Sequence, residues 1–139
     1  MNSIKIDDVI SLAKEKGFAV TSNNKDYNLK LIKHNIYSIE FTLPFTEIIL
    51  PANAGLIYSY TIKNVNTNLV VYKGEGEEYG KEINKFEGML KSYVKIINIF
   101  SSYDVKINDK YLFSIFGLKF WKIKVVEYFE NNNWKEFNL

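Results

Sequence analysis

The most constraining feature of the sequence is a row of apolar residues that recurs every three to four positions between residues 77 and 101. Its members are Tyr79, Ile83, Phe86, Leu90, Tyr93, Ile97 and Phe100. Side chains at this spacing lie on one face of an α-helix. The pattern therefore predicts a helix of about 25 residues, roughly 37 Å long, with one face buried. The rest of the chain must supply an apolar surface that this face can cover.

Short runs rich in β-branched and aromatic residues flank the predicted helix and are typical of strands. Before the helix we expect strands at 29–33, 36–43, 46–50, 56–63 and 69–73. After it we expect strands at 105–107, 111–116, 118–129 and 134–137. Turn-forming residues separate these runs, among them Asn108-Asp109 and 131–133. Such short connections favour antiparallel neighbours.

The predicted order of elements makes the chain an α+β protein. A short N-terminal helix, capped by Asp7 or Asp8 and ended by Gly17, precedes the strands. We expect one antiparallel, curved sheet packed against the long helix, with the short helix at its edge. No linker or repeat divides the sequence, so residues 1–139 are expected to form a single α+β domain. With 22 aromatic residues, its core should need no metal or disulfide.

Composition excludes several kinds of chemistry. The chain has no cysteine and no arginine, and all 18 basic residues are lysine. Disulfides, thiolate metal sites, cysteine nucleophiles and arginine-based phosphate clamps are therefore absent. The one histidine, His34, lies in a predicted turn, and catalysis near neutral pH usually needs a titrating group of that kind. We therefore expect neither an enzyme nor a cofactor.

The segment Gly74-Glu75-Gly76-Glu77-Glu78 resembles a glycine-rich loop but matches no phosphate-binding pattern. Three carboxylates among the glycines would also repel a phosphate. We interpret Glu75, Glu77 and Glu78 as the charged start of the long helix, where the helix dipole favours acids. The alternatives are an acidic contact surface for a basic partner and a loop that holds a hard cation.

A second candidate segment combines lysines with a tryptophan. Lys119, Trp121, Lys122 and Lys124 lie on one predicted strand. There Lys122 and Lys124 share one face and Trp121 the other, whereas binding to a single nucleic-acid strand needs both kinds of side chain on one exposed face. The formal charge of +2 is also too small to imply a polyanionic partner. We do not expect nucleic-acid binding, although the segment remains its candidate site.

The long helix itself has features that point to a partner. Gly88 lies in its middle, opposite the apolar stripe, where a glycine costs about 1 kcal/mol relative to alanine. Ile96 and Ile99 add apolar groups outside the stripe. One interpretation is that a partner protein packs on this face. The alternative is that another part of the chain, such as the C-terminal hairpin, covers it.

These observations favour a small, non-catalytic protein-binding module of inhibitor or immunity type. The alternative is a protein that sequesters a small-molecule or nucleotide-derived ligand, in a pocket lined by Tyr58, Tyr60 and lysines. A single-strand nucleic-acid binder or an enzyme ranks third. The expected partner is another protein, with a second copy of the chain as a further alternative. We expect a cytoplasmic protein without a membrane partner, because no apolar stretch approaches the roughly 20 residues of a spanning helix.

Overall fold

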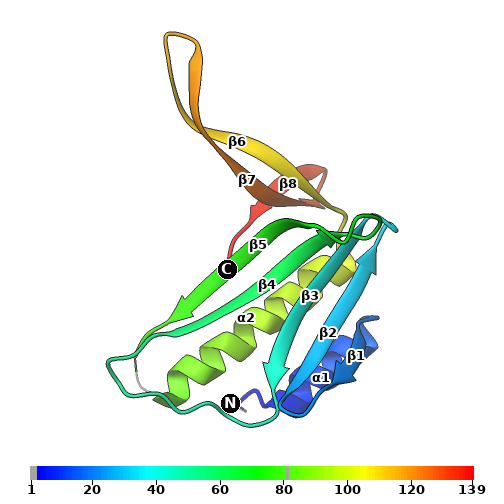
Figure 1. The fold of residues 1–139 in the computed structure, drawn as a ribbon, viewed down its shortest axis with the longest axis vertical. Helices are drawn as coiled ribbons and strands as arrows, with labels where there is room; N and C mark the ends of the chain where they lie inside the picture. Colours follow the sequence, from blue (N-terminus) through cyan, green and yellow to red (C-terminus); the bar gives the residue numbers. More distant parts are fainter. Residues whose placement is uncertain (1–2, 81) are drawn as a thin grey trace.

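A computed structural model describes residues 3–80 and 82–139, except for the side chains of residues 82–84, 114, 119 and 120. The described residues form two helices and eight strands (Figure 1). In chain order they are α1 (Ile6–Glu15), β1 (Ala19–Ser22), β2 (Asp26–Lys33), β3 (Tyr37–Pro44), β4 (Leu56–Asn64), β5 (Val70–Glu78), α2 (Glu82–Ser102), β6 (Val105–Ile115), β7 (Leu118–Glu130) and β8 (Asn133–Phe137). This arrangement confirms the predicted α+β class.

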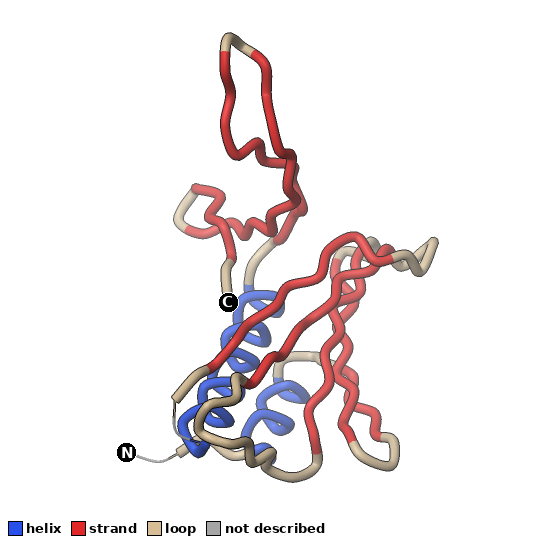
Figure 2. The backbone as a smooth tube through the Cα atoms, turned by 60° about the vertical axis from the view of Figure 1, so that its left-hand side comes forward, coloured by secondary structure: helices blue, strands red, loops and turns tan. Residues whose placement is uncertain are grey.

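The strands form two antiparallel sheets rather than the single sheet that was expected. The first contains β1 to β5 in sequence order, so each strand pairs with its neighbours along the chain. The second contains β6, β7 and β8, again in sequence order. Both helices pack on one face of the five-stranded sheet, with α2 running across it (Figures 1 and 2). We call the five-stranded sheet and the two helices the body.

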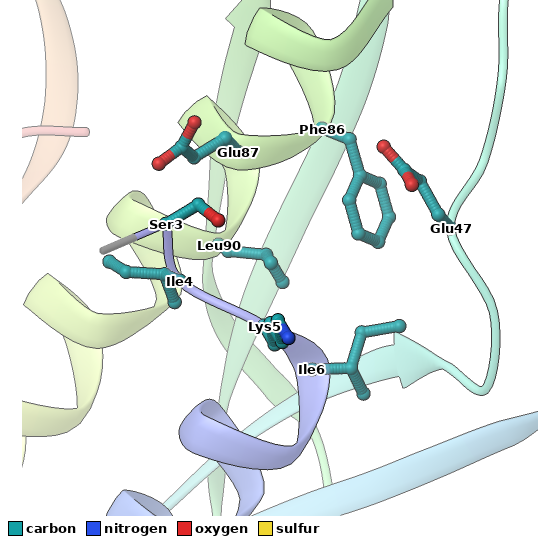
Figure 3. A pocket seen from close by; sticks show the side chains of 8 residues that line it. All are labelled: Ser3, Ile4, Lys5, Ile6, Glu47, Phe86, Glu87 and Leu90. Carbon is teal, nitrogen blue, oxygen red and sulfur yellow. The ribbon is translucent and has the colours of Figure 1, made fainter. Parts of the chain in front are cut away.

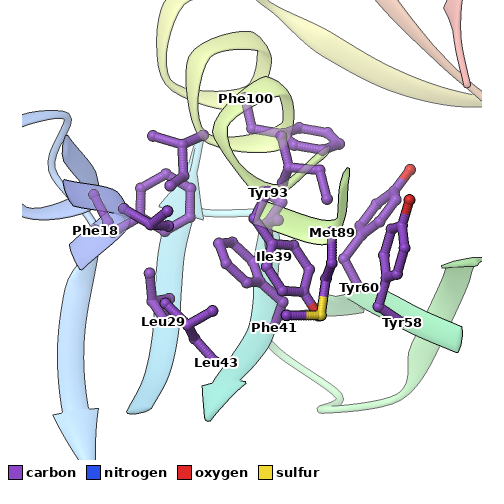
Figure 4. Close-up of a cluster of buried hydrophobic side chains, with 14 of the residues drawn as sticks. Phe18, Leu29, Ile39, Phe41, Leu43, Tyr58, Tyr60, Met89, Tyr93 and Phe100 are labelled. Atoms are coloured by element: carbon purple, nitrogen blue, oxygen red, sulfur yellow. The ribbon is translucent and has the colours of Figure 1, made fainter. Parts of the chain in front are cut away.

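The core lies between α2 and the inner face of the five-stranded sheet (Figure 4). The predicted stripe is confirmed over most of its length. Five of its members are buried: Phe86, Leu90, Tyr93, Ile97 and Phe100. Aromatic rings join the layers, and Phe41 of β3 stacks on Tyr93 of α2 with ring centroids 4.6 Å apart. Such stacked rings add to the hydrophobic stabilisation of the core.

The start of α2 differs from the prediction. The helix begins at Glu82 rather than near residue 77, because residues 70–78 pair with β4 as strand β5. Glu75, Glu77 and Glu78 therefore belong to a strand and not to a helix start. In the register of this pair, Gly76 lies opposite Tyr58 and Gly74 opposite Tyr60.

The tyrosine rings explain the alternating glycines of β5. A Cβ atom built on Gly74 would lie 2.1 Å from the Tyr60 ring, and one on Gly76 would lie 2.4 Å from the Tyr58 ring. Both distances are far below van der Waals contact. The two glycines thus leave room for two aromatic side chains on the inner face, and the Gly-x-Gly spacing follows from the two-residue period of a strand.

Residues 46–50 do not form the expected strand. They belong to the connection between β3 and β4, which spans residues 45–55. A buried lysine of α2 holds this connection: Lys85 Nζ donates hydrogen bonds to the backbone oxygens of Pro51, at 2.6 Å, and of Ala54, at 2.7 Å. The sequence did not single out Lys85. A buried ammonium group with two carbonyl acceptors fixes the loop to the helix.

Several predicted turns and ends are confirmed. The N-cap of α1 is Lys5 rather than Asp7 or Asp8, which lie in the first turn; the backbone N–H of Lys5 donates to Asp8 Oδ2 at 2.9 Å. Gly17 follows α1 with a φ of +94°. The turn between β2 and β3 contains His34 and Asn35, both with positive φ. The short strand β1 was not predicted.

Candidate functional site

Strands β6 and β7 extend beyond the body as a long two-stranded ribbon. Its base is anchored, because Val105, Val126 and Phe137 are buried against the core. Strand β8 pairs only with residues 126–130 of β7. Residues 108–124, which we call the arm, therefore form a ribbon of two strands, and Figures 1 and 2 show it projecting from the body. The expected turn at Asn108-Asp109 is wrong, since both residues lie inside β6.

The arm exposes large apolar side chains along its length. Phe116 at its tip is fully exposed, and the exposed fraction of Trp121 is 71%. Among the exposed apolar side chains of the arm are those of Leu112, Ile115, Phe116, Leu118, Trp121 and Ile123. Their combined exposed area is roughly 600–700 Å², taking about 175 Å² for a fully exposed large side chain. This area is divided between the two faces of the ribbon, and the largest contiguous apolar patch of a typical monomeric protein covers about 300–600 Å².

The tip of the arm is a two-residue turn made by Phe116 and Gly117. Their φ values are +52° and +80°, and Ile115 pairs with Leu118 on either side. Two positive φ values match the type I′ turn of tight hairpins, where Asn-Gly is the usual sequence. A bulky residue in this left-handed region costs about 1–2 kcal/mol. Phe116 contributes nothing to the core, so the fold does not require a phenylalanine at this strained position.

Trp121 is a second bulky residue with positive φ, at +56°. Its ring contacts that of Phe113 edge-on, with centroids 5.6 Å apart. Lys122 Nζ lies 3.2 Å from Asp109 Oδ2. The pairing of Lys122 with Tyr111 and of Lys124 with Asp109 places the two lysines on one face of the ribbon, as predicted. The side chain of Lys119 lies outside the described residues.

The helix residues singled out in the sequence have partners within the chain. A Cβ atom on Gly88 would lie 2.7 Å from the carboxyl group of Glu78, so β5 provides the close packing at this glycine. Ile96 is fully buried, and Ile99 is half-buried against the core. The packing of Gly88, Ile96 and Ile99 thus agrees with the alternative that other parts of this chain contact them.

The glutamate cluster of β5 does not act as one unit. Glu75 and Glu77 are exposed, whereas Glu78 reaches inward and accepts a hydrogen bond from Tyr58 Oη at 2.8 Å. Tyr58 Oη also lies 2.8 Å from Ser92 Oγ. Because Tyr58 gives its one proton to Glu78, Ser92 acts as the donor in the second bond. Burial is the main cause that raises the pKa of Tyr58. The network joins α2 to the sheet.

The two tyrosines of the alternative ligand pocket do not line a cavity found among the described residues. Tyr58 and Tyr60 are buried core residues, and burial raises the pKa of Tyr60. A different cavity, of about 310 Å³, lies where the N-terminal segment meets α2 (Figure 3). Its lining residues are Ser3, Ile4, Lys5, Ile6, Glu47, Phe86, Glu87 and Leu90. Its charged side chains are at least partly exposed to solvent, so no buried polar group there defines a ligand.

Other sites are not found in the described part of the chain. No group of three or more histidine, aspartate or glutamate residues lies close enough together there to hold a metal ion. No described helix has the length and apolar character needed to cross a membrane. His34 lies in an exposed turn, with its Nε2 atom 3.2 Å from Asp104 Oδ1.

A scan of protein-family models finds no match to this chain, and neither do searches of curated proteins and of solved structures.

Proposed function

We propose that this chain is a non-catalytic protein-binding module of inhibitor or immunity type, and that the arm is its contact element. One observation carries the proposal: a ribbon with roughly 600–700 Å² of exposed apolar side chains projects from a body whose core packs against only the base of the ribbon and β8. A standard protein–protein interface buries about 800 Å² on each partner. The arm offers a surface of that order.

The stability of the arm also supports a partner. A two-stranded hairpin without further cover is at best marginally stable in water. The phenylalanine of its tip turn adds backbone strain and no core packing. Binding of the exposed rings in a partner would offset both costs. This is the usual energetic pattern of interface hot spots, in which a few buried aromatic residues supply most of the affinity.

A single-strand nucleic-acid surface is the second candidate. It is suggested by the exposed ring of Trp121, on which a base could stack, and by Lys122 and Lys124 on the same strand, although the two lysines share one face of the ribbon and the strand alternation places Trp121 on the other. The absence of arginine and the small net charge argue against it. Sequestration of a small ligand has less support, because Tyr58 and Tyr60 are packed in the core rather than around a pocket.

The proposal is tested by comparing two sets of exposed apolar residues. In the arm variant, Phe116, Leu118 and Trp121 are each replaced by serine. In the matched control, Ile57 and Leu69 of the body, both 66% exposed, are replaced by serine. Immobilised wild-type protein and the control should retain the same protein from extracts of the cells that express the chain, at one-to-one stoichiometry. The arm variant should bind it at least about tenfold more weakly.

Two results would contradict the proposal. One is retention of the partner by the arm variant with the affinity of the wild type. The other is that single-stranded oligonucleotides bind the wild type tightly at physiological salt and lose that binding in the arm variant, which would assign the arm to nucleic acid. Circular dichroism of both variants establishes that the body remains folded.

A further inference from the structure

We infer that the arm inserts into a cleft of its partner protein, and that this cleft is apolar inside and rimmed by carboxylates. The inference rests on the proposed function and names the chemistry of the partner. Three observations support it: the two-sided distribution of apolar side chains, the charge of the arm, and the open edges of its two strands.

Apolar side chains lie on both faces of the ribbon. Ile115 and Leu118 are cross-strand partners and share one face. Leu112 lies an odd number of residues from Ile115, so it points to the other face, together with Ile123, which pairs with Lys110. A flat surface would cover one face and leave the other in water. A second copy of the arm would likewise cover only one face. A cleft in a partner encloses both faces.

The arm is cationic relative to the rest of the chain. Four of its residues are lysines and one is an aspartate, which gives a formal charge of +3 in a chain of net charge +2. Lys110 is matched by Glu136 at the base of the arm, at 3.1 Å, and Lys122 by Asp109. Lys124 is exposed and forms no ion pair with any residue that the structure describes. Carboxylates around the cleft would complement this charge, while two arms of like charge would repel one another.

The edges of the ribbon distinguish a protein cleft from a lipid surface. Over residues 108–124, β6 and β7 pair only with each other among the described residues, so each strand has an edge without a neighbouring strand. In hydrocarbon, unpaired backbone groups along such edges would cost several kcal/mol each. A protein cleft can supply backbone or side-chain partners to them, as in β-strand addition.

The test places a photo-crosslinking benzoylphenylalanine at Leu112 in one variant and at Leu118 in another, one on each face of the arm. A third variant carries it at Ile57, an exposed residue of the body. Each full-length protein is illuminated in cell extract, and the cross-linked residues are mapped by mass spectrometry. We expect both arm positions to label the same protein, at opposite walls of one cleft whose rim is rich in Asp and Glu, while Ile57 labels neither wall.

The outcomes separate this inference from the proposed function. Labelling of a protein from only one of the two arm positions would retain the arm as a binding element but overturn the cleft. Labelling of this chain itself would assign the arm to a second copy and overturn the inference. Labelling of no protein from either position would overturn the inference and the proposed function together.

Charge and lipid are tested on the same protein. The double variant Lys122→Glu and Lys124→Glu should slow association with the labelled partner about tenfold at low salt, and the difference should disappear at high salt. Lys16→Glu with Lys25→Glu, two exposed lysines of the body, is the control and should have little effect. An unchanged rate in the arm variant would overturn the acidic rim. Co-sedimentation with phosphatidylserine vesicles that is lost in Phe116→Ser would assign the arm to a membrane and overturn the inference.

Discussion

The body and the arm are built from the same kinds of residue but use them differently. In the body, strands such as β3 and β4 alternate between a buried inner side chain and a more polar outer one. In the arm, exposed apolar side chains lie on both faces, among them Leu112 on one face and Ile115 on the other. Strand propensity is therefore the same in the two regions, and only the presence of a covering layer makes apolar residues part of a core.

The glycines of the two regions show the same contrast. Gly74 and Gly76 of the body are required because neighbouring tyrosine rings occupy the space of a Cβ atom. At Gly117 in the arm no atom lies within 4 Å of that position, and the requirement is a φ of +80°. The body thus selects glycine through packing and the arm through backbone conformation.

The largest expected effect is alkaline unfolding of the body. Burial raises the pKa of Tyr60 and of Tyr93 above the ordinary value near 10. A raised pKa in the folded state means that stability is complete below pH 10 and is lost as the pH rises further. Each pH unit above about 10 should remove up to roughly 1.4 kcal/mol for each of the two tyrosines. Urea unfolding between pH 9 and 12 measures this loss, and the arm variant should show the same profile. Ionisation of all tyrosines near pH 10 without unfolding would contradict it.

Replacing a leucine by alanine in each region compares how much a buried and an exposed side chain contribute to the free energy of unfolding. Leu90→Ala removes a fully buried side chain of α2 and should lower the free energy of unfolding by about 2–5 kcal/mol. Leu112→Ala removes a half-exposed side chain of the arm and should change it by less than about 0.5 kcal/mol. Chemical denaturation measures both values. Equal losses would mean that the arm is covered in the free protein.

The glycine comparison predicts a smaller difference. Gly74→Ala forces a Cβ atom into the Tyr60 ring and should destabilise the body by about 1–3 kcal/mol. Gly117→Ala meets no atoms and adds only the strain of a left-handed alanine, about 1 kcal/mol and confined to the tip turn. Thermal unfolding distinguishes the two, since the transition of the body should shift only for Gly74→Ala. A shift of similar size for Gly117→Ala would show that the turn and the body unfold as one unit.

The smallest effect is expected for the ion pair of the arm. Lys122 and Asp109 are both well exposed, so their interaction should contribute less than about 1 kcal/mol. A double-mutant cycle with Lys122→Ala and Asp109→Ala measures this interaction. A coupling well above that value would indicate that the pair is shielded from water, contrary to the exposed arm described above.

Helical periodicity was the most reliable guide to this fold, because the stripe from Phe86 to Phe100 can be recognised without tertiary information. The start of α2 was mispredicted for a non-local reason. Glu77 and Glu78 suit the first turn of a helix, yet they belong to β5 because Tyr58 and Tyr60, some 20 residues earlier, pair with its glycines. Pairing between separate segments is not visible in local composition.

The strands expected at 111–116 and 118–129 place the break at Gly117, where the arm turns, but the turn expected at Asn108-Asp109 hid the full length of β6. Asn108-Asp109 carries a strong turn preference but lies inside β6, while the true turn has only Gly117 as a signal. The unbroken apolar run from Tyr111 to Phe113 indicates a strand with apolar side chains on both faces. Such a strand is either buried on both faces or exposed on both. Sequence cannot separate these two cases, since the difference depends on whether another element covers the ribbon. For the same reason, the sequence left open whether a partner or this chain covers Ile96, which is buried.

Both tryptophans lie in the C-terminal sheet, so tryptophan and tyrosine signals report on different regions of this molecule. Trp121 lies on the arm, and Trp134 lies on β8 with Lys106 Nζ 4.1 Å from the centre of its ring. The body contains tyrosines and phenylalanines but no tryptophan. Tryptophan emission therefore reports only on the C-terminal sheet, while the near-ultraviolet circular dichroism of tyrosine reports largely on the body. Occupation of the arm and unfolding of the body can be followed in one unlabelled sample.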